Sequence, residues 1–253
     1  MPDKYSIAAL LLVVTAGVMI ALALVNDTGE SVTVALVIAG MICAITGIFI
    51  LTFSGDETVD PRLIGILPAQ GSINLSRIMH HFDIHGKAHF LPPAVTRENR
   101  VMQFNPASTE KLSIGSTPGS FRETGPPGLV TIPSSALLID DLKKKNALII
   151  PDNEENITQL LRETIEDVLK LAPRVSARWS GTTVTLTFHD YPSIYGCNVI
   201  ARISRDYCSM NPCPVCSLCG ALIAEGRDKV VMLEGCSAGL SSKDVIAVFS
   251  IVP

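Results

Sequence analysis

The sequence is poor in aromatic residues and in charge. Aromatic residues make up 5% of the 253 residues, with a single Trp, and charged residues make up 17%. So few aromatic side chains argue against a stacking surface for single-stranded nucleic acid. The 20 Lys and Arg residues and the 24 Asp and Glu residues give a net charge of −4, which excludes a strongly basic surface for binding phosphates. We therefore expect no nucleic-acid partner.

Several motifs of known chemistry are also absent from the sequence. There is no Walker A loop, no H-E-x-x-H metal motif and no G-x-G-x-x-G dinucleotide fingerprint. We therefore expect a protein without a cofactor that binds a partner protein or a small apolar ligand, rather than an enzyme. The alternatives that stay open are a metal or iron–sulfur redox protein and, below it, a thiol oxidoreductase.

Long apolar runs are what the sequence does have. Hydrophobic residues make up 47% of the chain and the mean hydropathy is +0.38, which is too apolar for a wholly water-soluble protein. Residues 7–25 and 32–53 contain no Asp, Glu, Lys or Arg, and each has the ~20 residues that a helix needs to cross a bilayer. The alternatives are a cleaved signal peptide and a buried hairpin, but two successive full-length runs favour a transmembrane hairpin over residues 1–53.

The charges around these runs predict the orientation of the hairpin. The turn between them holds Asp27 and Glu30 and no base, whereas Lys4 precedes the first run and Arg62 and Arg77 follow the second. By the positive-inside rule, the turn faces outward. The sequence thus predicts a two-pass protein of the cell (plasma) membrane with both termini in the cytoplasm, and the lipid bilayer is its first expected partner.

Small residues line the second run, at Gly40, Ala44 and Gly47. Gly40 and Ala44 are spaced as a small-xxx-small pair, which lets two helices approach closely. The pair predicts packing within the hairpin. The alternative is contact with a protein partner or a homo-oligomer through Gly40, Ala44 and Gly47.

The remainder of the chain has the composition of a globular α+β protein. We expect a linker at 54–61, an α+β lobe with long loops at 62–150 and a C-terminal α+β domain at 151–253. In this last domain, periodicity and turn residues predict the order α-β-β-α-β-β, with helices packed on an antiparallel sheet. The predicted elements are a helix at 157–171, strands at 175–179 and 182–188, a helix from Pro212 or Pro214 to about Ala224, and strands at 229–233 and 244–252.

Cysteines are concentrated near the C-terminus. Cys213, Cys216 and Cys219 have the x2, x2 spacing of ferredoxin cluster ligands, and a fourth ligand would be Cys208 or Cys236. The sequence therefore offers a candidate zinc or iron–sulfur site at Cys208, Cys213, Cys216, Cys219 and Cys236.

Two other interpretations of these cysteines stay open. On a helix, Cys213, Cys216 and Cys219 form one stripe with Ile223, as small apolar side chains facing a core do, and this is the interpretation that we favour. Cys213 and Cys216 also have the C-x-x-C spacing of redox-active thiols, in which a helix N-terminus lowers the thiol pKa.

Histidines form a second concentration, at His80, His81, His85 and His89. Gly86 and the strand-like residues after it interrupt the helix that would align the last three. We therefore expect surface and turn histidines, and a metal or acid–base role is the alternative.

Two resemblances add to this picture. The layout of two apolar helices, a lobe containing Leu91-Pro92-Pro93 and a C-terminal α/β lobe resembles uncharacterised archaeal two-helix membrane proteins. Residues 220–252, which include GALIAE, KVV and EGCSAG, resemble the end of vinyl-reductase-type ligand-binding domains. That second resemblance implies binding of small apolar molecules and, in some members, of a metal through cysteines, with Cys236 at one such position. A further cysteine expected early in the last strand is missing from residues 244–252.

Overall fold

The computed structural model describes residues 4–25, 30–53, 61–96, 98–107, 126–145, 148–239 and 242–252. The chain divides into two compact units, Met1–Thr58 and Val59–Pro253. Most of the predicted turn between the apolar runs and of the predicted linker, at 26–29 and 54–60, lies outside the described residues.

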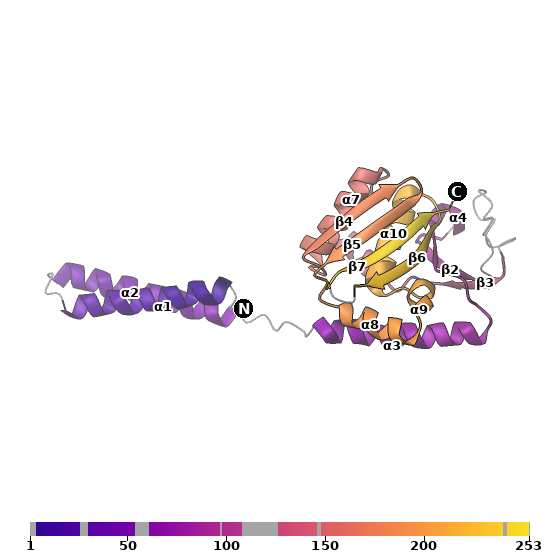
Figure 1. Cartoon of the computed structure of the whole chain (residues 1–253). Coiled ribbons are helices and arrows are strands. Elements are labelled where there is room, and N and C mark those ends of the chain that lie inside the picture. The colour runs from indigo at the N-terminus through magenta and orange to yellow at the C-terminus, as the bar shows by residue number, and fades with distance from the viewer. Residues whose placement is uncertain are drawn as a thin grey trace. The chain divides into compact units, whose positions relative to one another are not determined.

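The first unit is a pair of helices, α1 (Lys4–Val25) and α2 (Glu30–Phe53), which pack against each other (Figure 1). Residues Ile7–Val25 and Ser31–Ile50 are long and apolar enough to span a membrane. Most of their large side chains are exposed: Leu24, for example, is 79% exposed. A helix that exposes apolar side chains on most sides suits lipid rather than water as its solvent.

Glycines and alanines form the contact between these two helices. Ala9, Ala16 and Ala23 on α1 are buried. A Cβ atom at Gly40 would lie 2.8 Å from Cγ1 of Ile20, and one at Gly47 would lie 3.2 Å from the carbonyl oxygen of Ala9. The small residues of α2 therefore serve packing within the hairpin, one of the two roles that their spacing predicts. Contact with another copy through Gly40, Ala44 and Gly47 stays a prediction.

Substitution of Gly40 by Leu should weaken this helix pair. The larger side chain has no room against α1, and overpacking of a tight contact costs about 1–3 kcal/mol. Gly17→Leu is the matched control, because nothing lies within 4 Å of a Cβ atom at Gly17. Unfolding in mixed micelles of increasing SDS content, followed by circular dichroism, measures the difference. Equal midpoints for the two variants would contradict this packing.

The second unit contains every described strand of the chain. Its elements are α3 (Pro61–His81), β1 (His89–Leu91), α4 (Pro93–Thr96), β2 (Met102–Pro106), β3 (Gly128–Thr131), α6 (Ala136–Lys145), α7 (Glu154–Arg162), the π-helix η1 (Glu163–Val168), β4 (Arg174–Ser180), β5 (Thr183–His189), α8 (Ile194–Ile203), α9 (Asp206–Met210), α10 (Pro214–Arg227), β6 (Val231–Ala238) and β7 (Val245–Ile251).

The described strands form a single seven-stranded sheet in the order β3-β2-β1-β6-β7-β5-β4. All of its pairings are antiparallel, as predicted for the C-terminal region. Strand β1, from the predicted 62–150 lobe, pairs directly with β6, from the predicted 151–253 domain. The predicted boundary at residue 150 therefore falls within one sheet, because the β1–β6 pairing joins the two segments.

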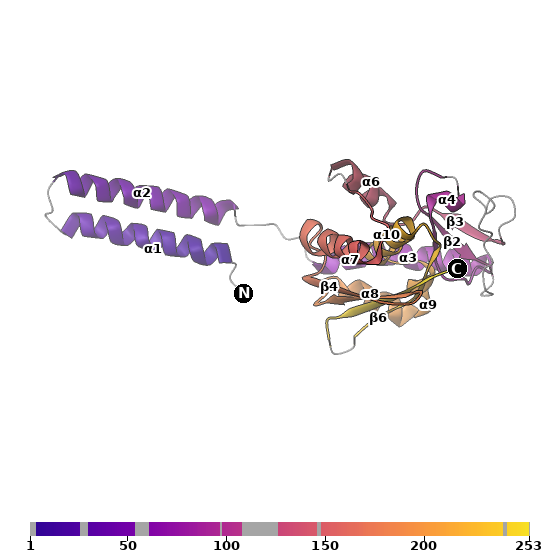
Figure 2. The ribbon, with the colours of Figure 1, turned by 90° about the horizontal axis from the view of Figure 1, so that it is seen from above.

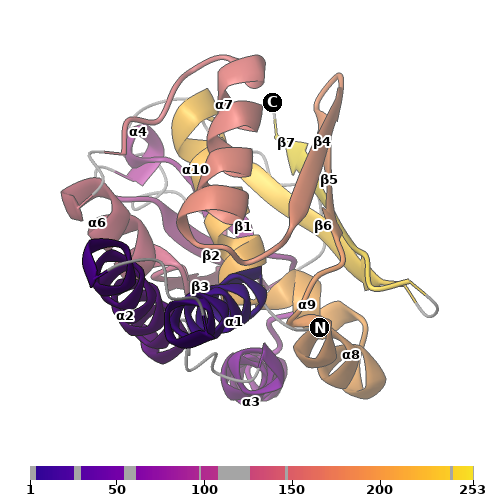
Figure 3. The ribbon, with the colours of Figure 1, turned by 90° about the vertical axis from the view of Figure 1, so that its left-hand side faces the viewer.

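Two groups of helices pack against this sheet. Helices α7 and α10 lie on one side, as Figure 2 shows from above, and α10 contacts β1, β6 and β7. Helices α3, α8 and α9 gather elsewhere, below the sheet in Figure 3, where α8 and α9 contact β6 and α3 contacts α8 and α9. The main core lies between α7, α10 and the strands, and it includes Ile157, Leu161, Leu186, Leu222 and Phe249.

The predicted C-terminal elements are present, with two differences. Helices α8 and α9 stand between β5 and α10 where none was predicted. The predicted helix at 157–171 begins earlier, at Glu154, where the side chain of Asn153 accepts a hydrogen bond from the backbone of Asn156, and it continues as η1. The amphipathic pattern of that helix is confirmed, since Ile157, Leu161 and Ile165 are fully buried.

Candidate functional site

Four cysteine thiols from three elements meet near the start of α10. Cys197 lies on α8, Cys213 and Cys216 lie at the start of α10, and Cys236 lies on β6. The Sγ atoms of Cys216 and Cys236 are 4.0 Å apart. The thiol of Cys197 interacts with those of Cys213 and Cys236, and the thiol of Cys216 also interacts with both. Each of the four therefore contacts two others, and we call this set the thiol ring.

The first turn of α10 gives Cys213 a distinctive environment. Cys213 is the N-cap residue, and Pro214 follows it at a position where a missing N–H costs the helix nothing. Hydrogen bonds from the thiols of Cys197 and Cys216 lower the pKa of Cys213 well below its usual range. Backbone N–H groups of Cys216 and Val215 add to this effect and outweigh the opposing effect of burial. Cys213 is therefore the most acidic thiol of the ring.

The other three members of the ring are thiols. The hydrogen bonds of Cys197 with Cys213 and Cys236, together with burial, raise its pKa. The bond to Cys213 and burial likewise raise the pKa of Cys216. The interaction with Cys197 would lower the pKa of Cys236, but those with Cys208 and Cys216 and its burial outweigh it, so the pKa of Cys236 is raised. The lowered pKa of Cys213 thus contrasts with the raised pKa values of the other three thiols.

An irregularity in β6 directs Cys236 toward the ring. The register of β6 against β7 shifts between Leu233 and Gly235. Leu233 pairs with the buried Phe249 before the shift, and Cys236 pairs with the buried Ala247 after it. Directly paired residues share a face of a sheet, so Cys236 lies on the face that α10 covers. Strict alternation from Leu233 would have placed it on the other face.

The structure brings together three of the five predicted ligands. Cys213, Cys216 and Cys236 belong to the thiol ring, and Cys208 on α9 contacts Cys236 alone among them by a thiol hydrogen bond. Cys219 is fully buried in the main core, and burial raises its pKa. Cys219 therefore matches the interpretation of a small apolar core residue. Cys197 was not among the predicted ligands.

Apolar and aromatic groups surround the ring. A small hollow beside it is lined by Phe188, Tyr191 and Val245 together with Cys197, Cys213 and Cys216. Burial, followed by the nearby thiols, raises the pKa of Tyr191, so its hydroxyl stays protonated. As the side chains stand, no group of three or more His, Cys, Asp or Glu residues among those described is placed to hold a metal ion.

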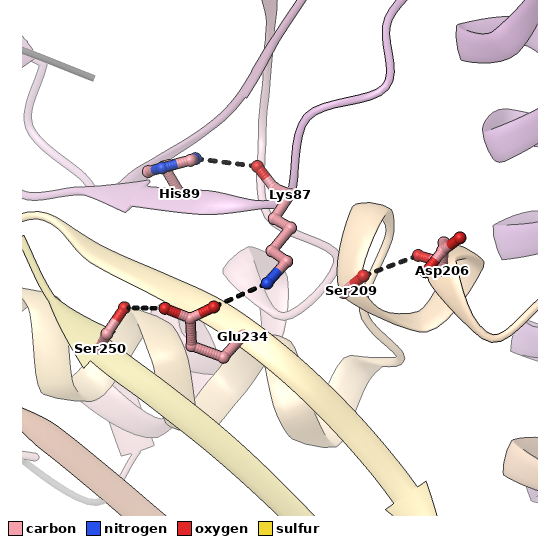
Figure 4. A network of polar contacts seen from close by, with 6 residues as sticks. All are labelled: Lys87, His89, Asp206, Ser209, Glu234 and Ser250. Atoms are coloured by element: carbon pink, nitrogen blue, oxygen red, sulfur yellow. Dashed lines mark hydrogen bonds and ion pairs between the residues drawn. The ribbon is translucent and has the colours of Figure 1, made fainter. Parts of the chain in front are cut away.

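A polar network joins the start of β1 to β6 and β7 (Figure 4). The Nζ atom of Lys87 lies 2.6 Å from Oε2 of Glu234, and the hydroxyl of Ser250 donates to Oε1 of Glu234 at 2.8 Å. Partial burial alone would raise the pKa of Glu234, but the bonds from Lys87 and Ser250 outweigh it and lower the pKa. Burial lowers the pKa of His89, which bonds the backbone oxygen of Lys87. This network ties β1 to β6.

Two of the predicted histidines come together next to this network. The rings of His80 and His85 have centroids 4.5 Å apart. With Lys87 and Asp206 they line a pocket of about 290 Å³, and Figure 4 shows Lys87 and Asp206 on neighbouring elements. His89 is buried elsewhere, against Phe104. The pocket brings basic and acidic groups together, so its charge does not favour one class of ligand.

A Ser–His–Asp arrangement lies on the sheet face opposite α7. Oγ of Ser176 is 3.2 Å from Nε2 of His189, and Nδ1 of His189 is 3.6 Å from Oδ2 of Asp244. The second distance is long for the hydrogen bond that would fix the imidazole. Ser176 is exposed on β4, whereas acyl transfer depends on oxyanion stabilisation in a water-excluded site. We therefore assign no catalysis to these residues.

A second serine motif has the sequence of a hydrolase motif but not its structure. Residues 235–239 read G-C-S-A-G and match the G-x-S-x-G pattern of hydrolases. That pattern requires a sharp turn from a strand into a helix. Here Ser237 lies within β6, paired with Ile246 of β7, so the nucleophile turn is absent.

Comparison with known protein families, with characterised proteins and with solved structures gives no match for this chain.

Removal of the charge on Glu234 should destabilise the second unit. Glu234→Gln loses the ion pair with Lys87, and we expect the free energy of unfolding at pH 7 to fall by about 1 kcal/mol. Because the pKa of Glu234 is lowered in the fold, its contribution is present at neutral pH and is lost as the pH falls through that lowered pKa. Chemical unfolding of both proteins as a function of pH measures this, and the two curves should converge in acid.

The matched control is Asp141→Asn, which removes the exposed pair between Asp141 and Lys145. It should change the free energy of unfolding by less than about 0.5 kcal/mol. An equal loss in the two variants would show that the Lys87–Glu234 pair has no special role.

Proposed function

We propose that this protein is a membrane-anchored metal-binding protein. The Met1–Thr58 hairpin spans the cell membrane twice with both termini in the cytoplasm, and the thiol ring of the second unit binds one zinc ion through Cys197, Cys213, Cys216 and Cys236. The observation that carries the proposal is the meeting of four thiols from α8, α10 and β6, each of which interacts with two of the others.

Sulfur spacing favours a single ion over a cluster. Four sulfurs that each lie about 2.3 Å from a tetrahedral zinc ion are about 3.8 Å apart. The Sγ atoms of Cys216 and Cys236 are 4.0 Å apart, which is close to that spacing. An iron–sulfur cluster holds its thiolates further apart, because each binds a different iron. Rotation of the Cys side chains about χ1 has to complete the coordination, since their present positions do not converge on one point.

The compartment agrees with this chemistry. All seven cysteines are free, and thiols persist in the reducing cytoplasm, where cysteine clusters more often bind metals than form disulfides. The cytoplasmic placement and the bound zinc ion are both parts of the function proposed here. A partner protein or small apolar ligand for this unit stays a prediction.

A second candidate function rests on the asymmetry between Cys213 and Cys216. A helix N-cap thiolate followed by a protonated thiol is the arrangement of C-x-x-C oxidoreductases. The Cys213 thiolate would attack a substrate disulfide and release one thiol. Cys216 would then lose its proton, attack Sγ of Cys213 and release the second thiol, leaving a Cys213–Cys216 disulfide and a reduced substrate.

Metal content of the full chain tests the main proposal. After purification in mild detergent under argon, we expect about one zinc ion per chain by elemental analysis, without visible absorption. Ser substitution at any one of Cys197, Cys213, Cys216 and Cys236 should lower this content severalfold. The controls Cys219→Ala and Cys43→Ala should keep it, because both residues lie outside the ring.

Other results would redirect the assignment. Folded, metal-free protein that takes up no added zinc would overturn the proposal, and a Cys213–Cys216 disulfide after mild oxidation would then favour the oxidoreductase. Brown protein containing iron and sulfide would replace zinc with a cluster.

Protonation of the ring predicts how binding depends on pH. Zinc binds thiolates, and the pKa values of Cys197, Cys216 and Cys236 are raised, so binding should release about three protons per ion near neutral pH. Affinity should therefore fall steeply as the pH falls. Calorimetry in buffers with different ionisation enthalpies measures the released protons, and a value near zero would contradict the assigned protonation states.

A further inference from the structure

Helix α3 has one buried face and one exposed apolar face. Ala69, Ile73, Ser76 and Met79 are buried on the side that meets α8 and α9. The opposite side exposes Leu63, Ile66, Leu67 and Ile78, and Phe82 follows directly after the helix. We call these five residues the α3 apolar face.

Exposure on this face is large. Leu67 is 74% exposed and Phe82 is 68% exposed. Scattered apolar side chains on a protein surface need no explanation, but a row of them along one helix marks an interaction surface. At about 100° per residue, the five side chains fall within one side of the helix, with Gln70 and Asn74 between their two groups.

Chain connectivity limits what this face can meet. Seven residues, 54–60, separate the end of α2 from the start of α3. Even fully extended, they span at most about 25 Å. If α2 crosses the bilayer, as proposed above, the start of α3 is therefore always near the membrane surface, at a high effective concentration toward it.

We propose that α3 is an interfacial helix whose apolar face lies against the lipid bilayer. The inference rests on the proposed membrane anchoring and assigns the partner of this face as the lipid surface itself. An amphipathic helix in such a position buries its apolar face about 5–10 Å into the boundary between headgroups and acyl chains. Arg77 and His81, which are exposed on the same side of α3, suit the headgroup layer.

Quenching by brominated lipids tests this docking in the full chain. In a Trp179→Phe background, which removes the single native Trp, Leu67→Trp and Phe82→Trp each place one reporter on the α3 apolar face. Leu137→Trp on α6 is the matched control, because Leu137 is a helical Leu that is 81% exposed. The proteins are reconstituted in phosphatidylcholine vesicles with and without bromine near the headgroup end of the acyl chains, and thermal unfolding verifies that each variant folds.

We expect bromolipid to cause a marked loss of emission from the reporters at positions 67 and 82 and little loss from the control at position 137. Equal quenching at all three positions, or quenching at none while the chain still floats with the vesicles, would overturn the docking and leave the anchoring intact. Blue-shifted emission that bromolipid does not quench would also overturn it, by showing that a second copy or another protein covers the face. A chain that fails to float with the vesicles would refute the anchoring on which the inference rests.

Discussion

The shift in register within β6 is the constraint on which the candidate site depends. Because the shift falls between Leu233 and Gly235, Glu234 reaches Lys87 and Ser250, while Cys236 shares a face with Ala247 beneath α10. In a strand with strict alternation, Glu234 and Cys236 would lie on the same face, so that only one of these two contacts could form. The Lys87–Glu234 pair joins β1 to β6, and so the same few residues hold the sheet together and position a sulfur.

The sequence predicts elements well where a pattern is local. Charge-free runs identify α1 and α2, alternating β-branched residues identify the β4–β5 hairpin, and Pro214 marks the start of α10. Helices α8 and α9 were not predicted, because each is short and its apolar residues pack against elements that are distant in the sequence, such as α3 and β6. The single sheet was not predicted for a related reason. The β1–β6 pairing joins strands about 140 residues apart, and no local pattern in the sequence indicates it.

Two cysteines, Cys219 and Cys197, lie where the spacing of the motif does not place them, for two different physical reasons. The x2, x2 spacing brings three sulfurs together in a loop, but on an α-helix each step of three residues turns the side chain by about 60°. Cys219 is therefore carried away from Cys213 and into the core, where it is fully buried. Cys197 has no neighbouring cysteine in the sequence, and only the path of α8 brings it to Cys213. A motif search that counts spacing without secondary structure therefore groups Cys219 with Cys213 and passes over Cys197.

Charge explains why such a ring would be placed at the start of a helix. The backbone N–H groups of Val215 and Cys216 stabilise negative charge on Cys213, the member of the ring whose pKa is lowered. A zinc ion with four thiolates carries two negative charges, so binding increases the charge that the site has to accommodate. The positive end of the α10 dipole acts on that added charge, and the partial exposure of Cys213 leaves it in contact with solvent. In the proposed zinc site, the N-terminus of α10 would favour both a thiolate at Cys213 and the metal-bound state, whereas the raised pKa values of the three remaining thiols would oppose the loss of protons that binding requires.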